Sequence, residues 1–214
     1  MTFRDLGGVW DQLRIEEVAS PDAFHAMPAR VHEFYNLRRQ NLQRPEIQPN
    51  RAHVALADFE SRWSGGYALI SQNVDNLHER AGSKKLLHMH GELLRARCVH
   101  CRGSFNWLED LSTETACPDC KRRGGLRPDI VWFGEVPYFL DEIAELVARC
   151  DLFVAIGTSG VVYPAAGLGE TARAHGATTV EINVEATASS HFQQRLVGSA
   201  AECVPRFFAS LTPS

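Results

Sequence analysis

The sequence predicts an α/β protein with a Rossmann-like, doubly wound parallel sheet, into which a small cysteine-bearing module and a helical segment are inserted. Three observations predict this fold. Short segments rich in β-branched and aromatic residues alternate with helical patterns, polar residues follow several of these segments, and two Cys-x-x-Cys pairs interrupt the alternation. The 214 residues, of which 44% are hydrophobic and 22% charged, are sufficient for a buried core.

The first helices are indicated by their start signals. Ser20-Pro21 and Pro28 each place a proline at an early helical position, where its missing N–H costs nothing. The helix that starts at Pro28 is expected to run to Gln43, just before Pro45.

A further helix is expected after Asn50, which is a typical N-cap residue. Within it, Leu56, Phe59 and Trp63 recur at helical spacing and therefore predict one buried stripe. The pair Gly65-Gly66 is expected to end this helix.

The second half of the chain alternates strands and helices. The strand candidates are residues 67–71, 129–133, 152–156 and 178–182, and the helices between them are expected at 139–149 and 164–175. Such an alternation favours a parallel sheet that helices cover on both faces, and ligands of these sheets bind beyond the carboxyl ends of the strands. Polar clusters stand at those ends, at 72–75, at 157–159, and at Asn183 with Glu185.

Charge and hydropathy exclude several classes of function. The net charge of −4 gives no general attraction to nucleic acid or to anionic lipid. The first ten residues have no apolar signal-peptide core, and no apolar run approaches the ~20 residues of a membrane span. We expect a cytoplasmic protein without a membrane partner.

Four of the six cysteines form two pairs, Cys98-x-x-Cys101 and Cys117-x-x-Cys120, with fifteen residues between the pairs. Two thiolates on each of two tight turns complete a tetrahedron around zinc, and four cysteine ligands leave no position for water, so a structural zinc is expected. His100, inside the first turn, is an alternative ligand. Buried or redox-active cysteines are the competing interpretation, but they rarely have this paired spacing.

No single polar segment is specific, but their order along the chain is. The segments are SQNVDNLH at 71–78, HMHGE at 88–92, the two cysteine pairs, RP at 127–128, VWFGE at 131–135, AIGTS at 155–159 and EIN at 181–183. Together they resemble the sirtuin family over almost the whole chain, and they are most similar to its bacterial, desuccinylase-type branch. The resemblance implies a Rossmann-like NAD-binding domain at 1–91 and 127–214 with a helical insert at 16–50, and a zinc-ribbon module at 92–126.

The resemblance also implies a reaction, NAD-dependent removal of acyl groups from the lysines of proteins or peptides. The amide oxygen of the acyl-lysine attacks the ribose of NAD, and the products are nicotinamide, free lysine and O-acyl-ADP-ribose. His90 is implied as the general base, which suits a side chain whose ordinary pKa lies near neutrality.

Further residues carry roles by the same resemblance. The residues implied at the cofactor are Phe3, Arg4, Gln72, Asn73, Asp75, Gly157, Thr158, Ser159, Asn183, Glu185 and Ala200. The residues implied to pair through their backbone with an extended substrate peptide are Val131, Trp132, Phe133, Gly134 and Glu135.

Tyr35 and Arg38 match the Tyr-x-x-Arg pair of that branch, and their spacing places them on one helix face. Arginine can bind a carboxylate through two hydrogen bonds while the tyrosine adds a hydroxyl donor, which suits succinyl, malonyl or glutaryl groups. By the resemblance, members with this pair also remove acetyl groups, so the pair implies added specificity rather than a switch. Without the resemblance, a solvated helix face would be the simpler interpretation.

The sequence departs from the family at its start. Family members typically open with a strand and a Gly-Ala-Gly-x-Ser loop before Thr-Phe-Arg, whereas this sequence begins Met1-Thr2-Phe3-Arg4, so that strand and that loop are expected to be missing. Such a loop supplies backbone N–H groups to the pyrophosphate. Two explanations stay open: a start that lies inside a longer enzyme, or a short form that binds NAD weakly.

Two other functions are alternatives to the deacylase. One is a catalytically weak or inactive module that holds acyl-lysine or ADP-ribose without turnover. The other is a zinc-ribbon nucleic-acid binder, suggested by Lys121-Arg122-Arg123, but no aromatic stacking residues accompany these charges, so we expect no nucleic-acid partner.

Overall fold

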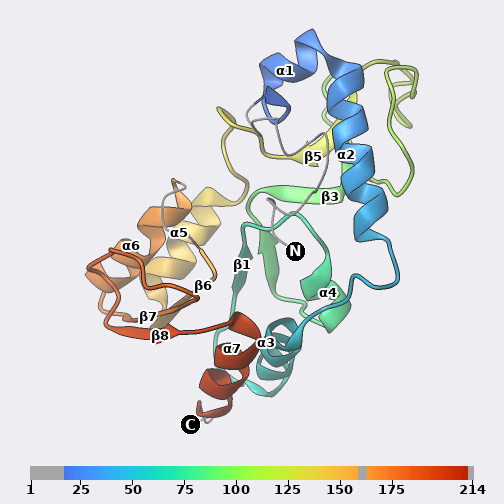
Figure 1. Cartoon of the computed structure of the whole chain (residues 1–214). Helices are drawn as coiled ribbons and strands as arrows, with labels where there is room; N and C mark the ends of the chain where they lie inside the picture. The colour runs from blue at the N-terminus through green and yellow to red at the C-terminus, as the bar shows by residue number, and fades with distance from the viewer. Residues whose placement is uncertain (1–16, 159–162, 212–214) are drawn as a thin grey trace. The chain divides into compact units, whose positions relative to one another are not determined.

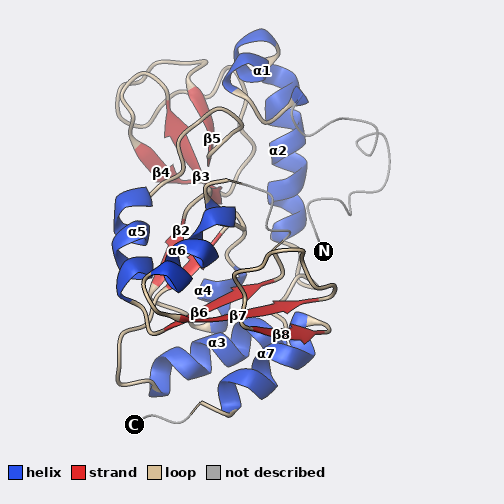
Figure 2. Cartoon of the chain, turned by 90° about the vertical axis from the view of Figure 1, so that its left-hand side faces the viewer, coloured by secondary structure: helices blue, strands red, loops and turns tan. Residues whose placement is uncertain are grey.

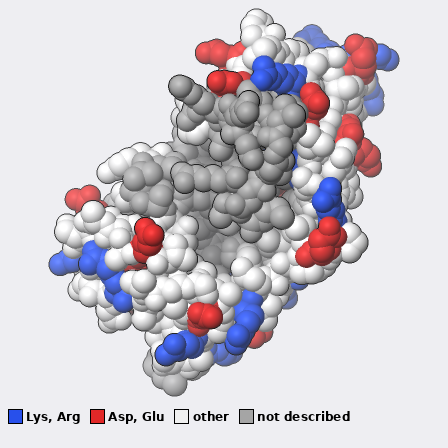
Figure 3. Space-filling model, in the orientation of Figure 1, with Lys and Arg blue, Asp and Glu red and all other residues white. Residues whose placement is uncertain are grey.

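The computed structural model describes residues 17–158 and 163–211, and these fold into two compact units (Figure 1). Of the described residues, the first unit contains 17–47, 73–75 and 90–138, and the second contains 48–72, 76–89, 139–158 and 163–211. The face in Figure 3 carries acidic and basic side chains side by side over its described part, as expected for a small net charge.

The second unit contains the parallel strands. β6 (Leu152–Ile156), β7 (Thr178–Asn183) and β8 (Gln194–Val197) form one parallel sheet, and β1 (Leu69–Ser71) pairs in parallel with β2 (Leu86–His88). The α/β class and the parallel pairing are therefore confirmed. Within the described residues the strands form two sheets where the sequence predicted one.

Helices cover both faces of the β6-β7-β8 sheet (Figure 2). α3 (Arg51–Arg62) and α7 (Ala200–Ala209) lie on one face, and α5 (Leu140–Arg149) and α6 (Leu168–Ala174) lie on the other. This is the doubly wound arrangement that the alternation of elements predicted. A 3-10 turn, Ala165–Gly167, forms the first part of the helix expected at 164–175.

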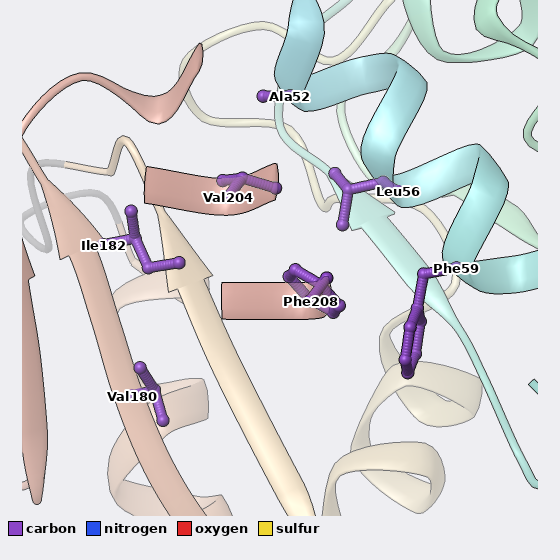
Figure 4. Packing of buried hydrophobic residues seen from close by; sticks show 7 residues of the cluster. All are labelled: Ala52, Leu56, Phe59, Val180, Ile182, Val204 and Phe208. Atoms are coloured by element: carbon purple, nitrogen blue, oxygen red, sulfur yellow. The ribbon is translucent and has the colours of Figure 1, made fainter. Parts of the chain in front are cut away.

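Alternate residues of β6 pack into two separate hydrophobic cores, one on each face of the sheet. Leu152 and Val154 of β6 pack against the core beside α3 and α7, whereas Phe153 between them packs against the core beside α5 and α6. The buried residues of the first core are Ala52, Leu56, Phe59, Val180, Ile182, Val204 and Phe208 (Figure 4). Each large side chain among them contributes roughly 1.5–3 kcal/mol by leaving water.

The start of α3 is fixed as the sequence predicted. The side chain of Asn50 accepts hydrogen bonds from the N–H groups of Ala52 and His53. In return, the backbone N–H of Asn50 donates to the His53 side chain, which completes a capping box. Leu56 and Phe59 are buried, and Trp63 stacks on Phe59 with ring centroids 4.9 Å apart. The remaining helix of this unit is α4 (Leu77–Ala81).

The first unit combines two helices with an antiparallel sheet. α1 (Pro21–Ala26) and α2 (Pro28–Leu42) begin at the two predicted prolines. β3 (Gly91–Cys98) lies between β4 (Ser104–Asn106) and β5 (Leu126–Ile130).

The strand predicted at 129–133 requires a correction. β5 ends at Ile130 and belongs to the antiparallel sheet rather than to a parallel one. Pro128, which has no N–H to donate, is tolerated because the β3–β5 register shifts between Glu92 and Ala96, directly at its partner. Beyond Ile130 the chain turns, so the apolar residues 131–133 are not paired as a strand.

Arg39 fastens α2 to the sheet of the first unit. It is fully buried, its Nε donates to the carbonyl of Leu93 at 3.2 Å, and its Nη1 donates to Asn36 Oδ1 at 2.8 Å. Asn36 in turn donates to the carbonyl of Leu111 at 2.8 Å and accepts from its N–H at 2.9 Å. Burial lowers the pKa of Arg39 to about 10, so the side chain stays charged at neutral pH.

Across the described residues, every helix is too short or too polar to cross a lipid bilayer.

The buried His32 of α2 predicts a pH-dependent stability. It is 2% exposed, and neither ring nitrogen has a hydrogen-bond partner within the described residues. Burial first, and then the charge of Arg39, lower its pKa from 6.5 to about 4. The unfolded chain therefore takes up this proton before the folded chain does, and stability falls as the pH drops from about 6.5 to about 4.

We expect His32→Leu to remove this part of the acid destabilisation, on the order of 1–2 kcal/mol after allowance for solvent screening. Urea unfolding at pH 7 and pH 5 measures it. His25→Leu, at an exposed position of α1, is the matched control. Equal losses on acidification in wild type and His32→Leu would contradict the prediction.

Candidate functional site

The second unit brings together polar groups at the carboxyl ends of β1, β6 and β7. Gln72 follows β1, and its Nε2 donates to Thr158 Oγ1 at 3.4 Å. Asn183, the last residue of β7, donates from Nδ2 to the carbonyl of Thr158 at 2.8 Å. Three predicted residues from distant parts of the sequence are thus neighbours, as expected for strand ends of a parallel fold.

The backbone around Thr158 is arranged for close approach. Gly157 has φ +62°, a conformation that favours glycine, and a Cβ at this position would meet no other atom within 4 Å. Its N–H is held by the carbonyl of Ile182 at 2.9 Å. The Asn183 side chain is also fixed, because its Oδ1 accepts from the N–H of Val184 at 2.9 Å. The Asn183 amide, the Thr158 hydroxyl and the accessible backbone of Gly157 therefore lie close together. Such a set can bind a ligand rich in hydroxyl and phosphate groups.

Two further candidates of this unit lie apart from that contact set. Glu185 is exposed, and Ala200 is the half-buried first residue of α7. Neither takes part in the hydrogen bonds that join Gln72, Thr158 and Asn183.

Glu181 was not predicted from the sequence as a site residue. It is 2% exposed, accepts from Arg195 Nε at 3.1 Å, and accepts from the N–H of Thr187 at 3.2 Å. It thereby holds the segment that follows Asn183 against the sheet. A carboxylate in the middle of an apolar strand was the available signal, because such a group needs partners when it is buried.

The first unit contains the other half of the candidates, including His90. The carbonyl of this half-buried histidine accepts from the N–H of Val131 at 2.9 Å. Gly91 beside it has φ +77°, and a Cβ there would lie 2.1 Å from the carbonyl oxygen of Asp129. Only glycine fits at position 91, where the backbone lies so close to that of Asp129. This close contact fixes the backbone next to His90.

Asn73 and Asp75 also belong to the first unit. Between them lies the buried Val74, whose carbonyl accepts from the N–H of Leu93 at 2.7 Å. Asn73 is exposed and Asp75 half-buried, so both side chains stand at the surface of a loop anchored to β3. Asn73, Asp75 and His90 thus lie in one unit, whereas Gln72, Thr158 and Asn183 lie in the other.

The segment 131–135 is a turn whose own N–H groups are largely engaged. The N–H of Val131 donates to His90, that of Trp132 to the Glu135 carboxylate, that of Phe133 to the carbonyl of Ala19, and that of Glu135 to the carbonyl of Trp132. A peptide that pairs with this segment would meet its carbonyl groups and the N–H of Gly134 rather than a complete strand edge.

Tyr35 and Arg38 do not form a solvated helix face. Tyr35 is 1% exposed, and its hydroxyl accepts from Trp132 Nε1 at 2.9 Å. Burial raises the pKa of Tyr35 to about 12, so the phenol keeps its proton. Arg38 is half-buried, with its guanidinium carbon 5.3 Å from the ring centre of Phe34, and burial lowers its pKa from the ordinary value.

The four paired cysteines form a compact cluster. Their sulfur atoms all lie within 4.8 Å of one another, with 3.7 Å from Cys98 to Cys120 and 3.6 Å from Cys101 to Cys117. A tetrahedral zinc with Zn–S bonds of about 2.3 Å requires sulfur separations of about 3.8 Å, so the cluster fits this metal. The exposed His100 is not part of it.

The two cysteine turns are built alike. The N–H of Arg102 donates to the carbonyl of Cys98 at 2.9 Å, and the N–H of Lys121 donates to that of Cys117 at 3.1 Å. Arg102 and Lys121 both have positive φ, at 63° and 61°. Each turn therefore presents two sulfurs toward the same point.

Three predicted site residues, Phe3, Arg4 and Ser159, lie outside the described residues.

Comparisons with known proteins show to which family the chain belongs. The model of the Sir2 family matches residues 1–164. An NAD-dependent protein deacylase of Bdellovibrio bacteriovorus is 54% identical over 207 residues, covering 96% of this chain and 87% of the relative.

Solved structures match as well. The crystal structure of a Sir2 homolog–NAD complex superposes with a TM-score of 0.88 at 37% identity, covering 98% of this chain and 82% of the other. A Sir2 bound to acetylated peptide gives a TM-score of 0.80 at 31% identity, covering 90% and 82%. The chain belongs to the Sir2 family.

Proposed function

We propose that this protein is an NAD-dependent protein deacylase that removes acyl groups from lysine side chains. The observation that carries the proposal is the 54% identity, over 96% of the chain, to a protein of that name. The contacts among Gln72, Thr158 and Asn183 support it, because they place hydrogen-bonding groups around an open glycine turn.

In this proposal the second unit binds NAD. Gln72, Thr158 and Asn183 hold its hydroxyl groups, and Gly157 lets the dinucleotide approach the backbone; Glu185 and Ala200 are assigned to the same ligand. When bound, NAD supplies the ribose that receives the acyl group. Asn73 and Asp75 are assigned to the nicotinamide end.

His90 is assigned as the general base, and nicotinamide and O-acyl-ADP-ribose are the proposed products. A base must accept a proton at working pH, which a histidine does. The glycine at 91 and the hydrogen bond from Val131 support this role, because they fix the backbone that carries the imidazole.

We expect His90→Ala to reduce nicotinamide release from acyl-lysine peptides by roughly 100- to 10,000-fold, the range for loss of a general base. Nicotinamide is measured by chromatography with NAD and an acetyl- or succinyl-lysine peptide. His25→Ala, at an exposed position, should leave the rate unchanged. Peptide binding without turnover by wild type would instead support the non-catalytic binding module.

We further propose that the acyl group includes chains that end in a carboxylate. Arg38 is the cation for this carboxylate, and Tyr35 is its hydroxyl donor. The burial of both side chains supports this assignment, because a half-buried guanidinium gains more from a bound anion than a fully solvated one does.

Arg38→Leu should lower kcat/KM for a succinyl-lysine peptide roughly 10- to 100-fold more than for the acetyl-lysine peptide of the same sequence, since a hydrogen bond to a charged group contributes about 1.5–3 kcal/mol. Arg30→Leu, an exposed arginine of the same helix, is the control. Equal losses on the two peptides would contradict carboxylate recognition.

Cys98, Cys101, Cys117 and Cys120 are proposed as the ligands of a structural zinc. Because such a site is formed only on folding, metal binding stabilises the folded unit, by on the order of 10 kcal/mol in isolated zinc modules.

Cys117→Ser should therefore bind far less zinc and unfold at a lower temperature, whereas Cys203→Ser, on α7 and outside the cluster, should keep its metal. Zinc content by mass spectrometry and thermal unfolding measure both effects. Full zinc retention in Cys117→Ser would contradict the ligand assignment.

A further inference from the structure

A buried ion pair closes the turn that follows β5. Arg127, 3% exposed, donates from Nη1 to Glu135 Oε1 at 2.6 Å and from Nη2 to Glu135 Oε2 at 2.8 Å. Burial raises the pKa of Glu135, but the hydrogen bonds from Arg127 and from the N–H of Trp132, together with the charges of Arg127 and Arg97, outweigh it, and the pKa lies below its ordinary value. Two parallel bonds of this kind fix direction as well as distance.

Trp132 is held inside that turn on two sides. Its backbone N–H donates to Glu135 Oε2 at 2.8 Å, and the guanidinium carbon of Arg127 lies 3.3 Å from its ring centre. The side chain is 2% exposed and has Phe24 of α1 at 5.5 Å between ring centroids. The indole therefore has little freedom to rotate, and its Nε1 is directed at the hydroxyl of Tyr35.

This contact decides what the Tyr35 hydroxyl can do. An indole N–H only donates, whereas a phenol has one proton to donate and lone pairs to accept with. Because Tyr35 accepts from Trp132 and keeps its own proton, that proton is directed away from the indole. Among the described residues, no hydrogen bond has Tyr35 as the donor.

We propose that Trp132 is a positioning residue for acyl specificity. By donating to the Tyr35 oxygen, it makes this phenol a donor with a fixed direction, suited to an end group that only accepts, the carboxylate of a dicarboxylic acyl chain. This inference rests on the proposed function, in which Tyr35 and Arg38 bind that carboxylate. An acetyl group has no such acceptor at its end, so the orientation of the phenol matters for acidic acyl chains alone.

The test compares Trp132→Phe with wild type on succinyl- and acetyl-lysine peptides of one sequence. Phenylalanine keeps a ring against Arg127 but removes the N–H donor. We expect the succinyl-to-acetyl ratio of kcat/KM to fall roughly tenfold, mainly through KM for the succinyl peptide, because one oriented hydrogen bond is lost. Calorimetry with the succinyl peptide should show a comparable weakening of its Kd.

A double-mutant cycle separates positioning from packing. If Trp132 acts through Tyr35, the double variant W132F/Y35F has the same succinyl-to-acetyl ratio as Tyr35→Phe alone. Phe24→Leu, which disturbs the same indole without touching the hydrogen bond, should leave the ratio unchanged. Tyr35→Phe removes the acceptor of the same Trp132–Tyr35 hydrogen bond. This hydrogen bond can therefore still be tested if Trp132→Phe folds poorly.

The outcomes distinguish this inference from the function on which it rests. Absence of turnover on both peptides by wild type overturns the proposed function. An active wild type in which Trp132→Phe slows both peptides equally, or in which the two substitutions are additive, overturns the positioning role alone. A ratio that Tyr35→Phe leaves unchanged overturns the inference as well, since Trp132 would then have no recognition residue to orient.

Discussion

The antiparallel pairing of β3 with β5 is the constraint on which the first unit depends. β3 begins at Gly91, next to His90, and ends at Cys98, while β5 starts beside that cysteine and leads into the turn at 131–135. A Cβ at Gly91 would lie 2.1 Å from the carbonyl oxygen of Asp129, so the two strands touch where the histidine is placed. One ladder thus connects the histidine, the metal cluster and the turn. A structural zinc therefore stabilises the backbone beside His90, because its ligand Cys98 is the last residue of β3 in that ladder.

The second unit follows a different physical rule. Helices cover both faces of β6, whose side chains are all apolar, so the polar side chains beside it are confined to the places where strands end. That confinement gathers Gln72, Thr158 and Asn183. Thr179 and Glu181 are buried polar residues within β7, and the N–H of Thr187 and the guanidinium of Arg195 compensate the burial of Glu181. The same carboxylate therefore helps to hold the loop beyond Asn183, together with the hydrogen bond from Thr179 Oγ1 to the carbonyl of His191.

Local signals in the sequence predicted local structure well. The cap at Asn50, the stripe of Leu56 and Phe59, and the two cysteine turns each depend on residues a few positions apart, and all are present. The carboxyl ends of β1 and β6 were predictable because an apolar run stops there. The partners of Trp132 were not, because Tyr35 lies 97 positions away and nothing near either residue indicates the contact. The end of β5 was misplaced for a similar reason: residues 131–133 are apolar enough for a strand, but Arg127 and Glu135 close a turn there through side chains.

A tyrosine that recognises an anion would ordinarily be expected at the surface, yet Tyr35 is almost completely buried. Burial has two effects that suit the role. It raises the pKa to about 12, so the phenol remains a donor rather than becoming a second anion beside the carboxylate that we propose it binds. It also fixes the hydroxyl before any ligand arrives, so little conformational entropy is lost on binding. The cost of burying the hydroxyl oxygen is offset by the indole N–H at 2.9 Å, so Trp132 supports the burial as well as the direction of the proton.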